Sequence, residues 1–109
     1  MIDGFYSVEF ETVLGSGGGV VVLEDGSLRG GDSKRYFLGS YRIEDQKLLA
    51  DVHVGTHMDK LDIPPVFGVN ELDLKITGKL TASAAIEGTA RSPQRPDSVM
   101  VFNMKRISG

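Results

Sequence analysis

The sequence predicts an all-β protein, a small eight-stranded antiparallel barrel that forms a single domain over residues 1–109. Apolar residues recur at every second position in about eight short segments, which is the spacing of strands. Fourteen glycines divide or bend these segments, and no window longer than a turn has helical periodicity. An open sheet of this size would expose two edges, so an up-and-down barrel is favoured over its main rival, a two-sheet sandwich.

The first half of the chain alternates between predicted strands and glycine-containing turns. Residues 15–19, GSGGG, are expected to form a flexible hairpin turn. Asp25-Gly26 suits a tight hairpin, because both central residues of such a turn tolerate positive φ. Residues 44–47, EDQK, are expected to form another turn. The strands predicted around these turns are Phe5–Val13, Val20–Glu24, Ser27–Gly31, Tyr36–Ile43 and Leu48–Asp59.

The second half begins with a connection and ends with three predicted strands. Residues 60–70 contain Pro64-Pro65, which cannot donate to a strand ladder, so this connection is expected to hold at most a short 3₁₀ or helical turn. Glu71–Leu80 has the clearest alternation of all. Residues 81–91 form the next predicted strand, Ser92–Ser98 a loop, and Val99–Ile107 the last strand.

The run RGGDSKRYFLGSYRI, residues 29–43, combines glycines with a strand-like pattern. A phosphate-binding loop needs a lysine and Ser or Thr at fixed spacing before a helix, and this run leads into a strand instead. We interpret Gly30-Gly31 as a tight corner and Asp32 as the start of a side-chain-stabilised turn. Gly39 is expected to mark a bend in a barrel strand.

Inward positions are predicted from apolar residues that alternate with charged ones on the same strand. Eight strands enclose an interior wide enough for side chains or for one small ligand. The candidate lining of such a cavity is Tyr6, Val8, Phe10, Val52, Val54, Leu72, Leu74, Ile76 and Phe102.

Composition and spacing exclude several functional classes. The net charge of −3 and the pI near 5.3 argue against direct nucleic-acid binding. There is no cysteine, and no Ser-His-Asp grouping can be assigned, so the protein is not expected to be an enzyme or to hold a cofactor. On a strand, His53 and His57 would lie roughly 13 Å apart, too far to share a metal ion. The chain shows neither a secretory signal nor a membrane span, which predicts a cytoplasmic protein.

An ordered set of short motifs resembles the GrlR family of negative regulators of type III secretion. The set begins with Gly4-Phe-Tyr6 in an alternating strand and continues with Asp25-Gly26 in a hairpin. It ends with GGDSKRYFLGSY (residues 30–41) and LLADVHV (residues 48–54). The resemblance covers about residues 4–54, and the second half agrees in general strand character. It implies a cytoplasmic, usually dimeric β-barrel of lipocalin-like shape with an apolar interior.

The resemblance also implies an anti-activator, which binds a helix-turn-helix transcription activator and does not contact DNA itself. In that family an exposed Glu-Asp-Glu-Asp tetrapeptide between two strands supports activator binding. The equivalent turn here is EDQK, so Glu44 and Asp45 are the predicted partner-binding residues. A homodimer is expected as well, with Val99 and Val101 on the outer face of the last strand. The alternative function is a carrier that holds an apolar or amphipathic small molecule inside the barrel.

Overall fold

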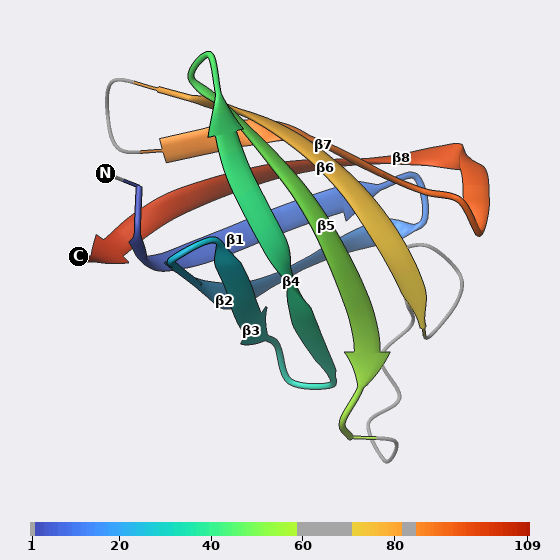
Figure 1. The fold of residues 1–109 in the computed structure, drawn as a ribbon. Helices are drawn as coiled ribbons and strands as arrows, with labels where there is room; N and C mark the ends of the chain where they lie inside the picture. Colours follow the sequence, from blue (N-terminus) through green and yellow to red (C-terminus); the bar gives the residue numbers. More distant parts are fainter. Residues whose placement is uncertain (1, 59–70, 82–84) are drawn as a thin grey trace.

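The computed structural model describes residues 2–58, 71–81 and 85–109 and is a closed antiparallel barrel (Figure 1). Each strand pairs with the next in the chain, and the last strand pairs with the first, which confirms the predicted eight-stranded up-and-down barrel. The strands are β1 (Gly4–Thr12), β2 (Gly15–Glu24), β3 (Ser27–Gly31), β4 (Arg35–Glu44), β5 (Lys47–Thr56), β6 (Leu72–Leu80), β7 (Ala85–Ser92) and β8 (Arg95–Ser108). The predicted 3₁₀ or helical turn falls in residues 59–70, outside the described residues.

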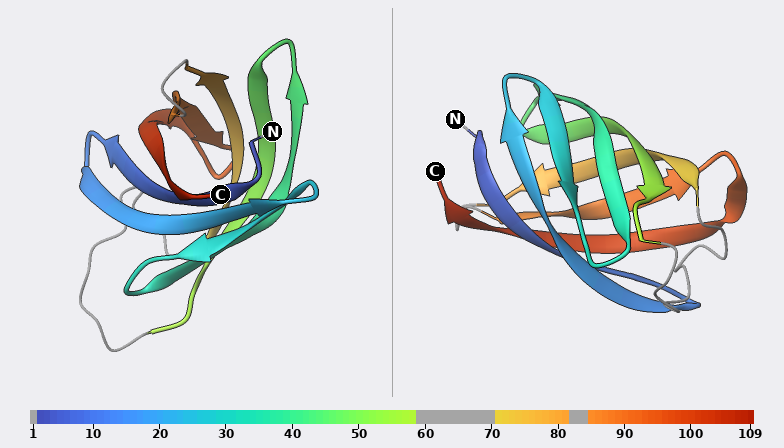
Figure 2. Two further views of the ribbon diagram at one scale, coloured as in Figure 1. Left: turned by 90° about the vertical axis from the view of Figure 1, so that its left-hand side faces the viewer. Right: turned by 90° about the horizontal axis from the view of Figure 1, so that it is seen from below.

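The strands run obliquely around the barrel, and β1 and β2 are strongly curved (Figure 2). Because the strands alternate in direction, the turns β2–β3 and β4–β5 lie at the same end as the beginning of β1. The β1–β2, β3–β4 and β7–β8 turns lie at the opposite end. This arrangement decides which turns are neighbours in space.

The interior is filled by one cluster of apolar side chains from all eight strands. The largest of them with almost no exposed surface are Tyr6, Leu23, Leu48 and Ile86. Seven of the nine predicted inward residues are buried, which confirms the predicted register: Tyr6, Val8, Val52, Val54, Leu72, Leu74 and Phe102. The other two, Phe10 and Ile76, are half-buried and pack against the cluster.

Two glycines allow neighbouring strands to approach very closely. A Cβ atom built on Gly39 would lie 2.0 Å from the carbonyl oxygen of Asp51, and one on Gly30 would lie 2.0 Å from that of Val20. Only a residue without a side chain fits against another backbone at this distance. The pairing of β4 with β3 and with β5 continues through Gly39 without a register shift, so this glycine marks a close approach of two strands and not a bulge.

The GSGGG run is not a turn, and this prediction was wrong. Residues 15–19 belong to β2, and the turn before them is Val13-Leu14, where the Leu14 amide donates to Thr12 Oγ1 at 3.1 Å. The Phe10 ring from β1 covers Gly17, since a Cβ built there would lie 2.7 Å from the ring. The glycines thus leave room for an aromatic side chain from the next strand.

The turn after Gly30-Gly31 is held by the Asp32 side chain, as predicted. Asp32 Oδ1 accepts hydrogen bonds from the amides of Lys34 (2.9 Å) and Arg35 (2.7 Å). The Asp32 amide in turn donates to the carbonyl oxygen of Arg35 at 2.9 Å. This network begins β4 at Arg35.

The predicted loop over residues 92–98 was also wrong, because β8 begins earlier, at Arg95. The pairing with β7 jumps from Arg91 opposite Val99 to Ser92 opposite Arg95. Pro96 lies inside this irregularity, where a residue without a backbone N–H removes no ladder hydrogen bond. Pro96 is therefore accommodated in a bulged strand.

Candidate functional site

The predicted partner-binding residues lie at the tip of the β4–β5 hairpin, which projects from one end of the barrel (Figure 1). Glu44 ends β4, Asp45 follows it, and both side chains are exposed. Asp45 and Gln46 have positive φ, 52° and 63°. Left-handed backbone conformations are unfavourable for residues other than glycine and are enriched at binding sites.

Basic side chains surround the two acids of this turn. Glu44 forms an ion pair with Arg42, which raises the pKa of the arginine. Lys47 lies opposite Glu44 in the hairpin, and Lys79 of β6 lies opposite Lys47. Among the described residues, Asp45 forms no ion pair. The turn is therefore an acidic tip with a basic rim.

A second turn at the same end, β2–β3, is tied to the N-terminal segment. Asp3 accepts a hydrogen bond from the Tyr41 hydroxyl through Oδ1 and one from the Asp25 amide through Oδ2 at 3.2 Å. These two bonds lower the pKa of Asp3. Burial, followed by the hydrogen bond to Asp3, raises the pKa of Tyr41 to about 12. These contacts join the N-terminal segment to β4 and to the β2–β3 turn.

The candidate cavity residues share the interior, but they are not equally covered. Phe10 and Phe37 meet edge to face, with ring centroids 6.3 Å apart, and both stay half-buried. Tyr6, in contrast, is 2% exposed and its hydroxyl donates to the Ile2 carbonyl oxygen at 2.6 Å. Apolar surface inside the barrel is therefore more accessible near Phe10 than near Tyr6.

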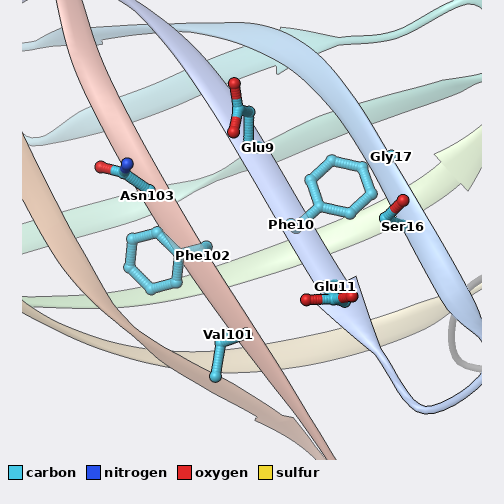
Figure 3. A pocket seen from close by; sticks show the side chains of 8 residues that line it. All are labelled: Glu9, Phe10, Glu11, Ser16, Gly17, Val101, Phe102 and Asn103. Atoms are coloured by element: carbon cyan, nitrogen blue, oxygen red, sulfur yellow. The ribbon is translucent and has the colours of Figure 1, made fainter.

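A pocket of about 500 Å³ lies along β1, β2 and β8 (Figure 3). Eight residues line it: Glu9, Phe10, Glu11, Ser16, Gly17, Val101, Phe102 and Asn103. Glu9 lies opposite Asn103, and Glu11 lies between Ser16 and Val101. Sequence reasoning missed this pocket, because it depends on the pairing of the first strand with the last.

The two histidines lie in separate surface contacts. His53 Nδ1 is 3.0 Å from Asp73 Oδ1 on the adjacent strand, and its Nε2 is 3.7 Å from Glu71. The contact with Asp73 raises the pKa of His53 and lowers the pKa of Asp73. His57 Nε2 lies 2.9 Å from the Asp32 carbonyl oxygen. Within the described ranges, no group of His, Cys, Asp or Glu side chains has the arrangement of a metal site.

Comparisons with known proteins assign no family to the chain. No protein-family model matches it, and no curated protein matches it. The described part of the chain also contains no helix with the length and hydrophobicity of a membrane span.

Proposed function

We propose that this protein is a GrlR-like negative regulator that binds a transcription activator with a basic surface and does not contact DNA itself. The observation that carries the proposal is the β4–β5 tip, where two exposed carboxylates are presented by a turn with two non-glycine residues at positive φ. Positive φ at both central residues is the geometry of a tight two-residue hairpin, which holds the two carboxylates at the exposed tip. An acidic hairpin tip on a rigid barrel suits charge-steered association with a basic protein.

The test removes the charge of the tip without changing its backbone. Glu44→Gln/Asp45→Asn is preferable to alanine, because asparagine tolerates the left-handed conformation of Asp45. The control is Glu24→Gln/Asp25→Asn, which removes two carboxylates from the other tight turn at the same end.

The partner for this test is the helix-turn-helix activator recovered with the protein from its own cells. Binding kinetics at low and physiological salt should show association several-fold slower for the tip variant and unchanged for the control, with equal melting temperatures. In a mobility-shift assay, the wild type should release the activator from its promoter and should not retard the DNA alone. Equal association rates for the two variants would reject the tip as the binding site.

A second candidate function, a carrier for an apolar small molecule, is favoured by the half-buried Phe10 and Phe37. A fluorescent fatty-acid analogue is a suitable probe. In a carrier, Ile76→Trp, which adds bulk at a third half-buried inward position, should weaken uptake of the probe. Lack of probe binding by the wild type would reject this function.

We also propose that the protein forms a homodimer through the outer face of β8. Val101 on this strand is 50% exposed, while Val99 is half-buried. Covering exposed aliphatic side chains favours association. Light scattering should report a dimer at micromolar concentration and a monomer for Val101→Glu. A wild-type monomer, or a Val101→Glu dimer, would contradict this assembly.

A further inference from the structure

We propose that the outer face of β5, β6 and β7 is a docking surface for an acidic segment of a partner protein. We call this surface the cationic face, and it consists of four exposed residues, Lys47, Lys75, Lys79 and Arg91. It shares Lys47 and Lys79 with the basic rim of the β4–β5 tip. It binds a partner of opposite charge to the one proposed for the tip, so it does not depend on the activator binding proposed above.

The cationic face contains two pairs of like charges on directly opposed positions of neighbouring strands. Lys47 of β5 lies opposite Lys79 of β6. Lys75 of β6 lies opposite Arg91 of β7. Side chains at opposed positions have Cβ atoms only about 4.5–5.5 Å apart, and like charges there destabilise a sheet. The fold thus retains two repulsive pairs on a single surface.

Acidic neighbours neutralise only part of this charge. Lys75 forms an ion pair with Asp51. Among the described residues, Lys47, Lys79 and Arg91 form no ion pair, although Glu44 lies opposite Lys47 and Glu87 lies opposite Lys79. Positive charge is therefore available to a partner at three of the four positions. Like-charge pairs lower the stability of the fold, and such pairs are expected where the charges serve binding.

The spacing of the two pairs fits an extended protein segment. Lys75 and Lys79 are four residues apart on β6, a separation of roughly 13 Å along a strand. Between the two charged rows lies an uncharged row formed by Leu49, Thr77 and Thr89, which are opposed across the three strands. An extended segment with acidic residues at positions i and i+4 spans the same distance, and its intervening residues would contact the uncharged row.

The pattern of charge favours a protein segment over a continuous polyanion. Asp51 and Glu87 lie within the same three strands, beside Lys75 and Lys79. A nucleic acid or an anionic membrane carries negative charge at regular short intervals and would meet these carboxylates, and the chain as a whole has a net charge of −3. A protein segment with two separate acids brings only two negative charges near them. The partner is therefore expected to present discrete acidic residues.

The test is a titration of the ¹⁵N-labelled protein with a nine-residue peptide, capped at both ends, that has Glu at positions 3 and 7 and Ser or Thr elsewhere. The largest amide shifts are expected in β5, β6 and β7 at low salt. Lys79→Gln/Arg91→Gln should weaken binding at least fivefold while its melting temperature stays equal to or above that of the wild type, because a repulsion has been relieved. A peptide with Gln in place of both Glu residues should not bind.

A matched control removes two exposed cations elsewhere on the barrel. Arg29→Gln/Lys105→Gln, on β3 and β8, should bind the acidic peptide as the wild type does. Single-stranded RNA and vesicles containing phosphatidylglycerol are the competing probes. The proposal is overturned if the wild type does not bind the peptide, if the largest shifts lie outside β5–β7, or if both double variants lose binding equally. It is also overturned if RNA or vesicles bind the cationic face at least as tightly as the peptide.

Discussion

The two tight turns at one end of the barrel, Asp25-Gly26 and Asp45-Gln46, have the same backbone shape in different settings. Both begin with an aspartate, and both central residues have positive φ, 49° and 82° in the first turn and 52° and 63° in the second. Glycine adopts this conformation without steric cost, whereas glutamine does not. The β4–β5 turn therefore holds Gln46 in a backbone conformation that glutamine disfavours.

The surroundings of the two turns differ as well. The β2–β3 turn is anchored, because the Asp25 amide donates to Asp3 and the Tyr41 amide donates to the Gly26 carbonyl oxygen at 2.9 Å. At the β4–β5 turn, the Leu80 amide donates to the Gln46 carbonyl oxygen at 3.1 Å, and the two carboxylates face solvent. The comparison indicates that a neighbouring strand holds each turn through one backbone hydrogen bond, and that the β2–β3 turn is in addition tied to the N-terminal segment.

The largest expected effect concerns the leucines that follow the two turns into the core. Leu28 and Leu48 are 3% and 0% exposed, each one residue into its strand. Replacing either by alanine should lower the free energy of unfolding by about 2–5 kcal/mol, because each change leaves a cavity. Urea denaturation measures this loss. If Leu48→Ala were nearly neutral, Leu48 would not anchor the β4–β5 hairpin in the core. The two turns would then differ in how their strands are packed and not only in the residues at their tips.

An exchange of glycine and glutamine tests the backbone difference directly. Gln46→Gly should raise the free energy of unfolding by about 1 kcal/mol, since it relieves a left-handed conformation. Gly26→Gln should lower it by about 1–2 kcal/mol for the same reason. Thermal or urea unfolding of the two single variants measures both changes. Changes of the same sign would contradict the strain assigned to Gln46.

Alkaline pH should weaken the contacts at the β2–β3 turn and leave the β4–β5 turn unchanged. Folding raises the pKa of Tyr41 from 10.0 to about 12, so the stability from this group is complete below pH 10 and is lost as pH rises toward 12. The difference in unfolding free energy between the wild type and Tyr41→Phe should therefore shrink over that interval. Urea unfolding at several pH values measures this difference. A constant difference would argue against the burial of Tyr41 together with its contact with Asp3.

Acidic pH should also lower the stability of this contact, but through Asp3, whose pKa is lowered instead of raised. Hydrogen bonds from Tyr41 and from the Asp25 amide lower the pKa of Asp3 below its ordinary 3.8. Its contribution is present above that value and is lost as pH falls through the lowered pKa. Asp3→Asn should remove this acid-sensitive component and leave the β4–β5 turn unchanged.

Alternation along the chain predicted the barrel and its inward residues, because one face of each strand must be apolar. It could not place GSGGG, because glycines have no side chain to alternate. The same sequence is therefore compatible with a turn and with a strand that is covered by Phe10. The signal for the true turn was Thr12, whose hydroxyl accepts from the Leu14 amide. Alternation does not encode side-chain positions, so it could not predict the ion pair between Arg42 and Glu44. It does not encode strand pairing either, so it could not predict that lysines of β5 and β6 lie opposite each other.

The smallest expected effect on stability comes from Arg42→Gln, which removes the positive charge that is paired with Glu44. The pair with Glu44 is exposed, and such pairs contribute little, so the melting temperature should not change. If the tip binds a basic activator as proposed, loss of this positive charge should speed association several-fold at low salt, and the gain should fade as salt screens the charges. Arg29→Gln, which removes the same charge from β3, should leave the rate unchanged. Equal rates for the two variants would show that Arg42 does not limit the attraction of the tip, and slower association of Arg42→Gln would mean that the partner contacts the basic rim instead of the carboxylates.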